Sequence, residues 1–179
     1  MKFSTYDPGT KSEIKALFTE VFSAAEEKSE GLLIGNLVDE MMSSTPQKDL
    51  YGFVATENQG ILGCIFFSRM TFTQNPIKVF ILSPVAVHSQ HQQKGIGQQL
   101  INYGLEKLKE AKVEIVLTYG DPNFYTKVGF KQISEEIIKA PLALTYPHGW
   151  LGQSLTGNTI QPITETPKCV VALNKPEYW

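Results

Sequence analysis

The sequence predicts an α/β fold in which a mixed central sheet is flanked by helices. Near the N-terminus, two stretches repeat apolar residues at the period of an amphipathic helix. Further along, short apolar and β-branched runs are separated by turn-forming residues, as in strands. One such run, Val79–Val87, precedes a helical stretch, Gly95–Glu110, and a second run, Val113–Thr118. A strand, a helix and a strand in this order form a parallel crossover, so we expect the sheet to contain at least one parallel pair.

The N-terminal segment predicts one short strand, Lys2–Tyr6, followed by two amphipathic helices. Apolar residues spaced three or four positions apart lie on one face of a helix. They are Ile14, Leu17, Phe18, Val21 and Phe22 in the first helix, and Ile34, Leu37, Val38, Met41 and Met42 in the second. The acidic stretch between them, Ser23–Gly31, is expected to be a mobile connection.

Three strands are expected next. Leu50–Thr56 and Ile61–Thr73 should pair as an antiparallel hairpin across a turn at residues 57–60. The third strand, Val79–Val87, is interrupted by Ser83-Pro84. Because proline lacks an N–H group, a bulge or a splayed strand is expected at that point.

The C-terminal half predicts one helix, one buried strand and several weaker elements. Gly95–Glu110 is the clearest helix, and Val113–Thr118 is mostly apolar, which suits a central position in the sheet. The weaker elements are a short helix at Asn123–Lys127 and closing strands at Phe130–Ile138 and Cys169–Leu173. Residues 141–167 are rich in Gly, Pro and Thr and are the least predictable part of the chain.

Length and composition limit the class of protein. The 179 residues are expected to form a single domain, residues 1–179. The net charge of −2 gives no electrostatic reason to expect nucleic acid or an anionic membrane as a partner. No apolar run reaches the roughly 18 residues that a spanning helix needs. The first residues also lack the apolar stretch of a signal peptide, so a cytoplasmic location is expected.

The cysteines and histidines do not predict a metal site. Cys64 and Cys169 lie far apart in apolar runs, without a CxxC pair, which indicates buried structural thiols. His88, His91 and His148 show no i, i+4 pairing. A zinc site is therefore not expected.

The most informative stretch joins the strand that ends at Val87 to the helix that begins near Gly95. It contains two glycines and a lysine, in the run Gln92-Gln93-Lys94-Gly95-Ile96-Gly97. Glycine permits a positive φ and a close approach of the backbone. Successive N–H groups in such a turn can converge on an anion, and the helix N-terminus adds its dipole. This geometry suits a pyrophosphate, and Lys94 could add charge at its rim.

This turn has three alternative interpretations. A Walker A loop needs GxxxxGK followed by Ser or Thr, which is absent. A dinucleotide fingerprint needs GxGxxG, but Leu100 stands at the third glycine position. The remaining alternative is a plain tight turn into a helix.

The turn resembles the acetyl-CoA motif of the GNAT superfamily. That motif is written Q/R-x-x-G-x-G/A, and Gln92, Gly95 and Gly97 fill its three defined positions after the strand end Pro84–His88. Relatives often have glycine at the position of Gln93. A second segment, Asp121–Phe130, resembles the family's sequence of tyrosine, three residues, then Gly-Phe.

The two motifs occur in the family's order, and the resemblance covers about residues 11–130. Outside that range, Pro147–Trp150 and Lys175–Trp179 are similar to an uncharacterised bacterial branch of the superfamily.

The resemblance implies a GNAT fold, in which two parallel strands, here Val79–Val87 and Val113–Thr118, splay apart. It implies acetyl-CoA as co-substrate, with the backbone of Val85, Ala86 and Val87 facing the pantetheine arm. The pyrophosphate is expected at Gln92, Gln93, Lys94, Gly95, Ile96, Gly97 and Gln98. Asn123 is expected to bond the pantetheine arm. Tyr125 is the candidate general acid, although it could instead only pack against the cofactor or bond its sulfur.

The activity implied is N-acetyl transfer, by direct attack of a primary amine on acetyl-CoA in a ternary complex. The acceptor would be a small-molecule amine or a protein N-terminus, and the protein a monomer or homodimer. The sequence does not identify the general base; the candidates are Glu26, Glu27, Glu30, His88, Asp121, His148 or a held water. The alternative is an acyl-CoA-binding sensor or an interaction domain without turnover, against which the intact turn and Tyr125 argue.

Overall fold

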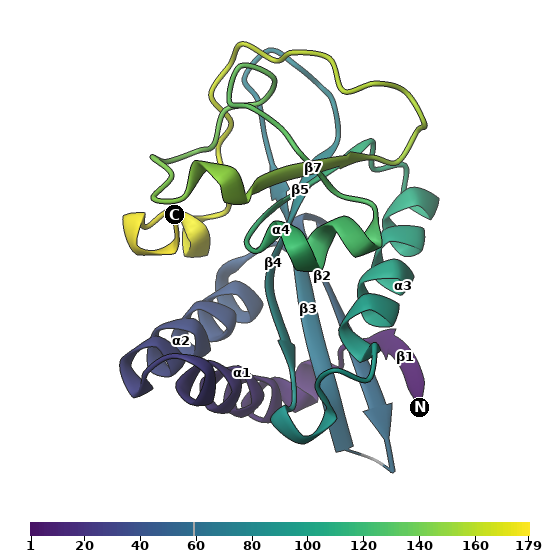
Figure 1. Cartoon of the computed structure of the whole chain (residues 1–179), viewed down its shortest axis with the longest axis vertical. Coiled ribbons are helices and arrows are strands. Elements are labelled where there is room, and N and C mark those ends of the chain that lie inside the picture. Colours follow the sequence, from purple (N-terminus) through teal and green to yellow (C-terminus); the bar gives the residue numbers. More distant parts are fainter. Residues whose placement is uncertain (59) are drawn as a thin grey trace. The chain divides into compact units, whose positions relative to one another are not determined.

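The fold is built on a seven-stranded sheet with the hydrogen-bonding order β1-β2-β3-β4-β5-β7-β6, accompanied by helices (Figure 1). The computed structural model describes residues 1–58 and 60–179. The elements are β1 (Lys2–Thr5), α1 (Lys11–Ala25), α2 (Lys28–Ser44), β2 (Leu50–Glu57), β3 (Gly60–Met70), β4 (Val79–Val87), α3 (Ile96–Glu110), β5 (Ile115–Tyr119), α4 (Pro122–Tyr125), β6 (Lys131–Gln132) and β7 (Trp150–Ser154). In the described part of the chain, no helix has both the length and the hydrophobicity needed to cross a membrane.

The described residues form two compact units. The first unit comprises Met1–Phe67 and Pro84–Gly104, and the second comprises Ser68–Ser83 and Leu105–Trp179. Strands β3 and β4 and helix α3 each contribute residues to both units. The single domain expected from the sequence stays a prediction, and each unit is described by itself.

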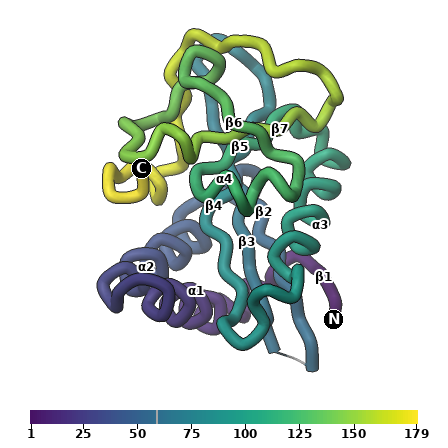
Figure 2. Tube along the Cα trace, in the orientation of Figure 1, coloured from purple at the N-terminus to yellow at the C-terminus, as the bar shows by residue number. Residues whose placement is uncertain are grey.

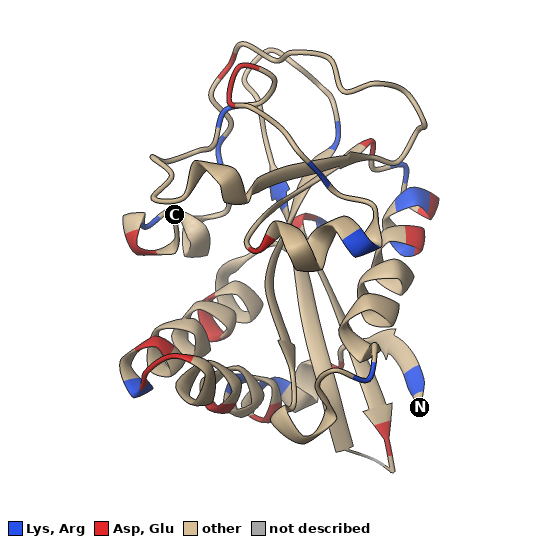
Figure 3. Ribbon diagram, viewed as in Figure 1, with Lys and Arg blue, Asp and Glu red and all other residues tan. Residues whose placement is uncertain are grey.

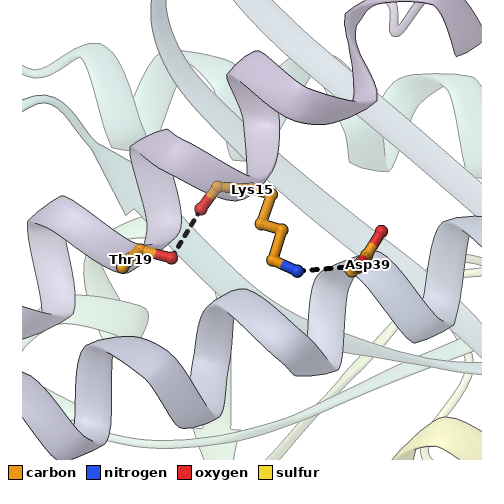
Figure 4. A network of polar contacts seen from close by, with 3 residues as sticks. All are labelled: Lys15, Thr19 and Asp39. Atoms are coloured by element: carbon orange, nitrogen blue, oxygen red, sulfur yellow. Dashed lines mark hydrogen bonds and ion pairs between the residues drawn. The ribbon is translucent and has the colours of Figure 1, made fainter.

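In the first unit, α1 and α2 form a closely packed helical hairpin. A Cβ atom at Gly31 would collide with Ser23 Oγ, and one at Gly35 would collide with the Thr19 hydroxyl, so both positions need glycine. Lys15 Nζ in α1 donates to Asp39 Oδ2 in α2 at 2.8 Å (Figure 4). This pair is half-exposed and adds little stability beside the close contact of the two helices.

The prediction of a mobile connection at Ser23–Gly31 is wrong for most of that stretch. Helix α1 continues to Ala25 and α2 begins at Lys28, so only two residues separate the helices. Glu26 and Glu27 are these two residues and are exposed, whereas Glu30 lies in the first turn of α2.

The two faces of β3 pack against different partners within the first unit. Successive side chains of a strand point to opposite faces of the sheet. Phe66 lies 6.1 Å from the ring of Phe18 in α1, whereas Phe67 lies 6.1 Å from the ring of Phe53 in β2. A Cβ at Gly104 of α3 would come 2.5 Å from the Phe67 ring, so the absence of a side chain there lets the helix approach this face. The turn expected at residues 57–60 includes Gln59, which lies outside the described residues.

In the second unit, β4 and β5 pair in parallel, which confirms the predicted crossover. The register runs from Val79 opposite Ile115 to Leu82 opposite Thr118, while β4 itself continues to Val87. The paired stretch thus ends one residue before Ser83-Pro84, the predicted site of interruption. On its other edge, β5 pairs antiparallel with β7.

The long closing strand expected at Phe130–Ile138 is wrong, because only Lys131–Gln132 are in strand conformation. Ser134 ends the strand by making a local turn. Its hydroxyl accepts from Glu136 N at 3.1 Å, and its carbonyl accepts from Ile137 N at 3.0 Å. A serine side chain that bonds nearby main chain in this way competes with sheet pairing.

The strand expected at Cys169–Leu173 is also wrong, and β7 takes its place in the sheet. Val171–Leu173 form a single 3-10 turn. Strand β7 lies within residues 141–167, where no strand was predicted. Its centre is Gly152, where a Cβ would lie 3.2 Å from both Ile133 and Leu117 side chains, so a residue typical of strands would be crowded there.

The C-terminal segment (yellow in Figure 2) ends at Trp179, which contacts Tyr119 at the end of β5. The main-chain oxygen of Trp179 accepts from Thr145 N at 2.8 Å and from Tyr119 Oη at 3.2 Å. Its indole Nε1 donates to Leu173 O at 2.8 Å, and its ring stacks on Tyr119 and meets Trp150 edge-on, with centroids 6.2 and 6.1 Å apart. Both the main chain and the buried side chain of Trp179 therefore help to hold the irregular tail.

Both cysteines are free thiols. Cys64 is fully buried, as predicted, and burial raises its pKa far above the ordinary value. Cys169 is only half-buried, contrary to the prediction, although burial raises its pKa as well.

We expect Trp179→Ala to lower the free energy of unfolding by about 3–5 kcal/mol, the usual cost of removing a large buried aromatic side chain. Denaturant unfolding followed by circular dichroism measures this change. Val171→Ala is the matched control, because Val171 lies in the same tail but is 77% exposed. Its effect should stay within about 0.5 kcal/mol. Equal effects of the two variants would contradict the role of Trp179 in holding the C-terminal segment.

Candidate functional site

The turn before α3 presents main-chain N–H groups at the N-terminus of a long helix. Two of its residues have a left-handed backbone, Gln93 with φ 61° and Gly95 with φ 77°. The first helical hydrogen bond runs from Gln99 N to Gly95 O at 3.0 Å. Within the described residues, the N–H groups of Ile96, Gly97 and Gln98 therefore have no helical acceptor. Alternating backbone conformations with free N–H groups form the kind of concave site that binds an anion.

Two side chains of this turn donate hydrogen bonds to main-chain carbonyls of the residues that precede it. Gln92 Nε2 donates to Val87 O, the last carbonyl of β4, at 3.0 Å. Lys94 Nζ donates to Gln90 O at 3.0 Å. Gln92 and Lys94 thus stabilise the backbone of the turn.

The three predicted residues at the end of β4 alternate in their burial. Ala86 is buried, while Val85 and Val87 are half-buried. A Cβ at Gly63 of β3 would lie 3.1 Å from Ala86 O, so the two strands approach closely there. The main chain of this strand end stays beyond the last pair of the β4–β5 register.

His88 has a structural role in the first unit. Its Nδ1 accepts from Gln90 N at 3.4 Å, capping the short 3-10 turn Ser89–His91. Its Nε2 lies 3.6 Å from Glu20 Oε1 in α1. These contacts tie the segment before the turn to α1.

The acidic candidates of the first unit gather at the α1–α2 end (Figure 3). Glu26 and Glu27 are exposed, and Glu30 is half-buried. Partial burial, and then the charges of Glu26 and Glu27, raise the pKa of Glu30 above its usual range. Nothing in this unit singles out one of the three as a base.

In the second unit, Tyr125 ends α4 and is enclosed on several sides. A Cβ at Gly120 would lie 2.7 Å from its ring. The rings of Phe124 and Phe130 meet it edge-on, with centroids 5.1 and 5.8 Å away. Burial raises the pKa of the Tyr125 phenol, and the Asp121 charge raises it further, whereas the Thr118 hydroxyl lowers it.

The Tyr-x-x-x-Gly-Phe segment closes on itself, which explains its residue types. Phe130 N donates to Tyr125 O at 3.2 Å. The chain reverses at Gly129, whose φ of 92° suits glycine. A Cβ at Gly129 would also lie 2.5 Å from the amide nitrogen of Gln153 in β7. The motif therefore fixes the Tyr125 ring and main chain.

Asp121, one of the candidate bases, is the N-cap of α4. Its Oδ1 accepts from Asn123 N at 2.9 Å, at the start of α4. Asn123 Nδ2 also donates to Asp121 Oδ1, at 3.1 Å, so the Asn123 amide is held locally. His148, another candidate base, is exposed, and its carbonyl accepts from Gln132 Nε2 at 2.7 Å.

The sequence did not single out Thr118 or Gly120. Thr118 is a buried polar residue on β5, and its hydroxyl donates to Leu82 O at 2.9 Å. Gly120 presents its backbone to the Tyr125 ring. A polar residue within an otherwise apolar central strand was the available signal for Thr118.

A sequence model of the family described as "Acetyltransferase (GNAT) domain" matches residues 48–132, which include both motifs. The chain is also 28% identical over 170 residues to the uncharacterised N-acetyltransferase YjhQ of Escherichia coli strain K12, covering 92% of this chain and 88% of that protein. The central part of the chain, just under half of its length, thus matches the GNAT acetyltransferase domain.

Solved structures of GNAT proteins share this fold. YhbS of Escherichia coli, in complex with CoA, superposes with a TM-score of 0.83 at 22% identity, covering 97% of this chain and 92% of that one. A GNAT acetyltransferase of Brucella melitensis, in complex with acetyl-CoA, has a TM-score of 0.75 at 24% identity and covers 97% of each chain. At these identities the likeness shows the fold, which confirms the α/β GNAT class predicted from the sequence.

The neighbouring residues Gln92 and Gln93 allow a test of the turn's backbone. A left-handed conformation costs a residue with a side chain roughly 1–2 kcal/mol, so we expect Gln93→Gly to stabilise the protein by about 0.5–1 kcal/mol. Gln92→Gly should instead destabilise it by about 1 kcal/mol, because Gln92 has φ −66° and bonds Val87 O. Thermal unfolding of both variants measures the two shifts. Shifts of the same sign would contradict the geometry described.

Proposed function

We propose that this protein is a GNAT enzyme that transfers an acetyl group from acetyl-CoA to a primary amine, by direct attack in a ternary complex. The observation that carries the proposal is the turn before α3, with its left-handed Gln93 and Gly95 and the free N–H groups of Ile96, Gly97 and Gln98. These groups fit a pyrophosphate, because each N–H can donate to a phosphate oxygen and the helix dipole favours negative charge. The acceptor amine is a small molecule or a protein N-terminus.

The residues assigned to acetyl-CoA are those at the end of β4, in the turn and in α4. Main-chain groups of Val85, Ala86 and Val87 continue past the last β4–β5 pair and suit an extended amide-bearing arm. Residues 92–98 take the pyrophosphate. Asn123 bonds the arm through its amide oxygen, since its amide nitrogen donates to Asp121.

The reaction exchanges one acyl bond for another. The amine nitrogen forms a C–N bond to the acetyl carbon, and the C–S bond to coenzyme A breaks. The attacking ammonium gives up one proton before attack and a second as the amide forms. One proton is required to neutralise the leaving thiolate.

Tyr125 supplies that proton in our proposal. A phenol held protonated by burial and by a nearby carboxylate keeps its proton through neutral pH. It can then donate to a thiolate as the C–S bond breaks. The enclosing rings and the backbone of Gly120 keep the phenol in one orientation.

We expect acetyl-CoA at about 100 times its Kd to add about 2.7 kcal/mol to the stability of the parent protein, seen as a rise in Tm. Gly95→Glu should abolish that rise, because the added carboxylate repels and obstructs a pyrophosphate. Gly157→Glu is the matched control. Gly157 also has a positive φ, 80°, and a Cβ there meets open space. Gly157→Glu therefore adds the same charge and a similar backbone strain as Gly95→Glu. No rise in a well-folded parent would overturn the acetyl-CoA assignment.

Tyr125→Phe should lower kcat by about 10²–10⁴, the usual contribution of a general acid, while KM for acetyl-CoA changes little. The assay is thiol release from acetyl-CoA with a panel of primary amines: a polyamine, an aminoglycoside, an amino acid and a peptide with a free N-terminus. An acid must be protonated, so parent kcat should fall only as pH rises through the raised pKa of Tyr125, and the variant should lack this alkaline fall.

Tyr146→Phe is the control for loss of a phenol, since Tyr146 is 68% exposed in the same unit. A less than tenfold effect of Tyr125→Phe, with the alkaline fall retained, would mean that Tyr125 only contacts the cofactor.

A further inference from the structure

His88 lies between the end of β4 and the turn before α3, and its main chain is bonded on both sides. Its N–H donates to Leu62 O in β3 at 2.8 Å, one residue beyond the end of β4. Its carbonyl accepts from His91 N at 2.8 Å, which closes the 3-10 turn Ser89–His91. The His88 side chain therefore projects from a fixed backbone.

The imidazole of His88 caps this 3-10 turn through Nδ1. That atom accepts from Gln90 N at 3.4 Å, and His88 is the N-cap residue. Only Cγ separates Nδ1 from Cβ, just as only Cγ separates Oδ1 from Cβ in asparagine, a commoner cap residue. A ring nitrogen that accepts carries no hydrogen, so the hydrogen of the neutral ring is on Nε2.

The second ring nitrogen of His88, Nε2, faces helix α1. It lies 3.6 Å from Glu20 Oε1. A carboxylate beside Nε2 favours the tautomer that has its hydrogen on this atom, and this tautomer leaves Nδ1 as an acceptor. Histidine thus makes two contacts at this position, whereas asparagine would make only the cap.

Gln90 connects the cap to the turn to which we assign the pyrophosphate. Its N–H donates to His88 Nδ1, and its carbonyl accepts from Lys94 Nζ at 3.0 Å. Gln92 Nε2 donates to the carbonyl of Val87, the residue before His88, at 3.0 Å. The side chains of Gln92 and Lys94 are therefore bonded to residues whose main chain His88 fixes.

We propose that His88 is a positioning residue for the pyrophosphate of acetyl-CoA, acting through the hydrogen bond from Gln90 N to its Nδ1 atom. The inference rests on the proposed function of residues 92–98. In this role His88 acts on the pyrophosphate only through the turn, which the cap keeps in the shape that presents its N–H groups. Without the cap, ligand binding has to order the turn, and that cost lowers the affinity.

A role of His88 in the general stability of its unit makes a different prediction. Loosening of the unit would weaken the binding of acetyl-CoA and of S-acetylpantetheine alike, because both carry the pantetheine arm. Loss of the positioned turn would weaken only the ligand that carries the pyrophosphate. S-acetylpantetheine lacks the pyrophosphate and the nucleotide, so it separates the two roles.

The experiment compares the parent with His88→Gln and His88→Asn by isothermal titration calorimetry with both ligands. Glutamine places its acceptor one bond too far from Cβ. We expect His88→Gln to raise the Kd for acetyl-CoA about tenfold, as the loss of one hydrogen bond can, and to leave the Kd for S-acetylpantetheine within about twofold of the parent value. His88→Asn keeps an acceptor at the place of Nδ1, so both Kd values should stay within about threefold of the parent.

His91→Gln is the matched control, because His91 is the other imidazole of the same 3-10 turn. Its main-chain N–H makes the closing bond with His88, and its ring meets the His88 ring edge-on, with centroids 5.8 Å apart. The Kd of His91→Gln for acetyl-CoA should stay within about twofold of the parent. Circular dichroism checks the fold of each variant, and His88→Ala replaces His88→Gln if the latter does not fold.

The position of the ring hydrogen gives a second readout that needs no ligand. In protein labelled with ¹⁵N-histidine, the ring nitrogens of His88 are assigned by their loss in His88→Asn. At mildly alkaline pH, where imidazole side chains are ordinarily neutral, we expect the hydrogen on Nε2. A hydrogen on Nδ1 would overturn the cap.

Equal Kd values of the parent and His88→Gln for acetyl-CoA, or equal losses with the two ligands, would overturn the role of His88. A loss in His88→Asn as large as that in His88→Gln would do the same. Each of these results leaves the acetyl-CoA assignment intact. If the well-folded parent does not bind acetyl-CoA, the proposed function of the turn fails, and the role of His88 fails with it. The titration of the parent therefore distinguishes the two failures.

Discussion

The parallel pairing of β4 with β5 is the constraint on which the candidate site depends. Parallel strands cannot be joined by a hairpin, so the chain must return through a crossover, here helix α3. The N-terminus of that helix follows the carboxyl end of β4, where α/β sheets commonly bind ligands. The register of this pair ends at Leu82 and Thr118, whereas β4 continues to Val87.

The elements that were predicted correctly are those whose signal is local. Helices α1, α2 and α3 each bury one apolar stripe, and strands β4 and β5 each bury one apolar run. The pattern of apolar residues is enough to identify each of these elements. The same holds for the turn before α3, since a left-handed backbone favours glycine, as at Gly95. The motif around Tyr125 was equally readable, because Gly129 and Phe130 serve a chain reversal within six residues.

The wrong predictions lie where contacts between residues distant in sequence determine the structure. Strand β7 contains a glycine at its centre because β5 and neighbouring side chains crowd it, a constraint that no local pattern contains. Leu173 lies in a turn whose carbonyl bonds the indole of Trp179. Thr118 was read only as one residue of a buried strand. Its hydroxyl donates to Leu82 O, and Leu82 is distant in sequence and adjacent in the fold.

The state of the two cysteines has a practical consequence for enzymology on this protein. Aromatic disulfide reagents react with thiolates, and the Cys64 thiol is both fully buried and held protonated. Cys169 is half-buried and its thiolate is also disfavoured. In the native protein, colour from such a reagent therefore reports chiefly the coenzyme A that is released. A slow rise toward two further equivalents per chain would instead report unfolding, so one cuvette serves as both activity assay and integrity check.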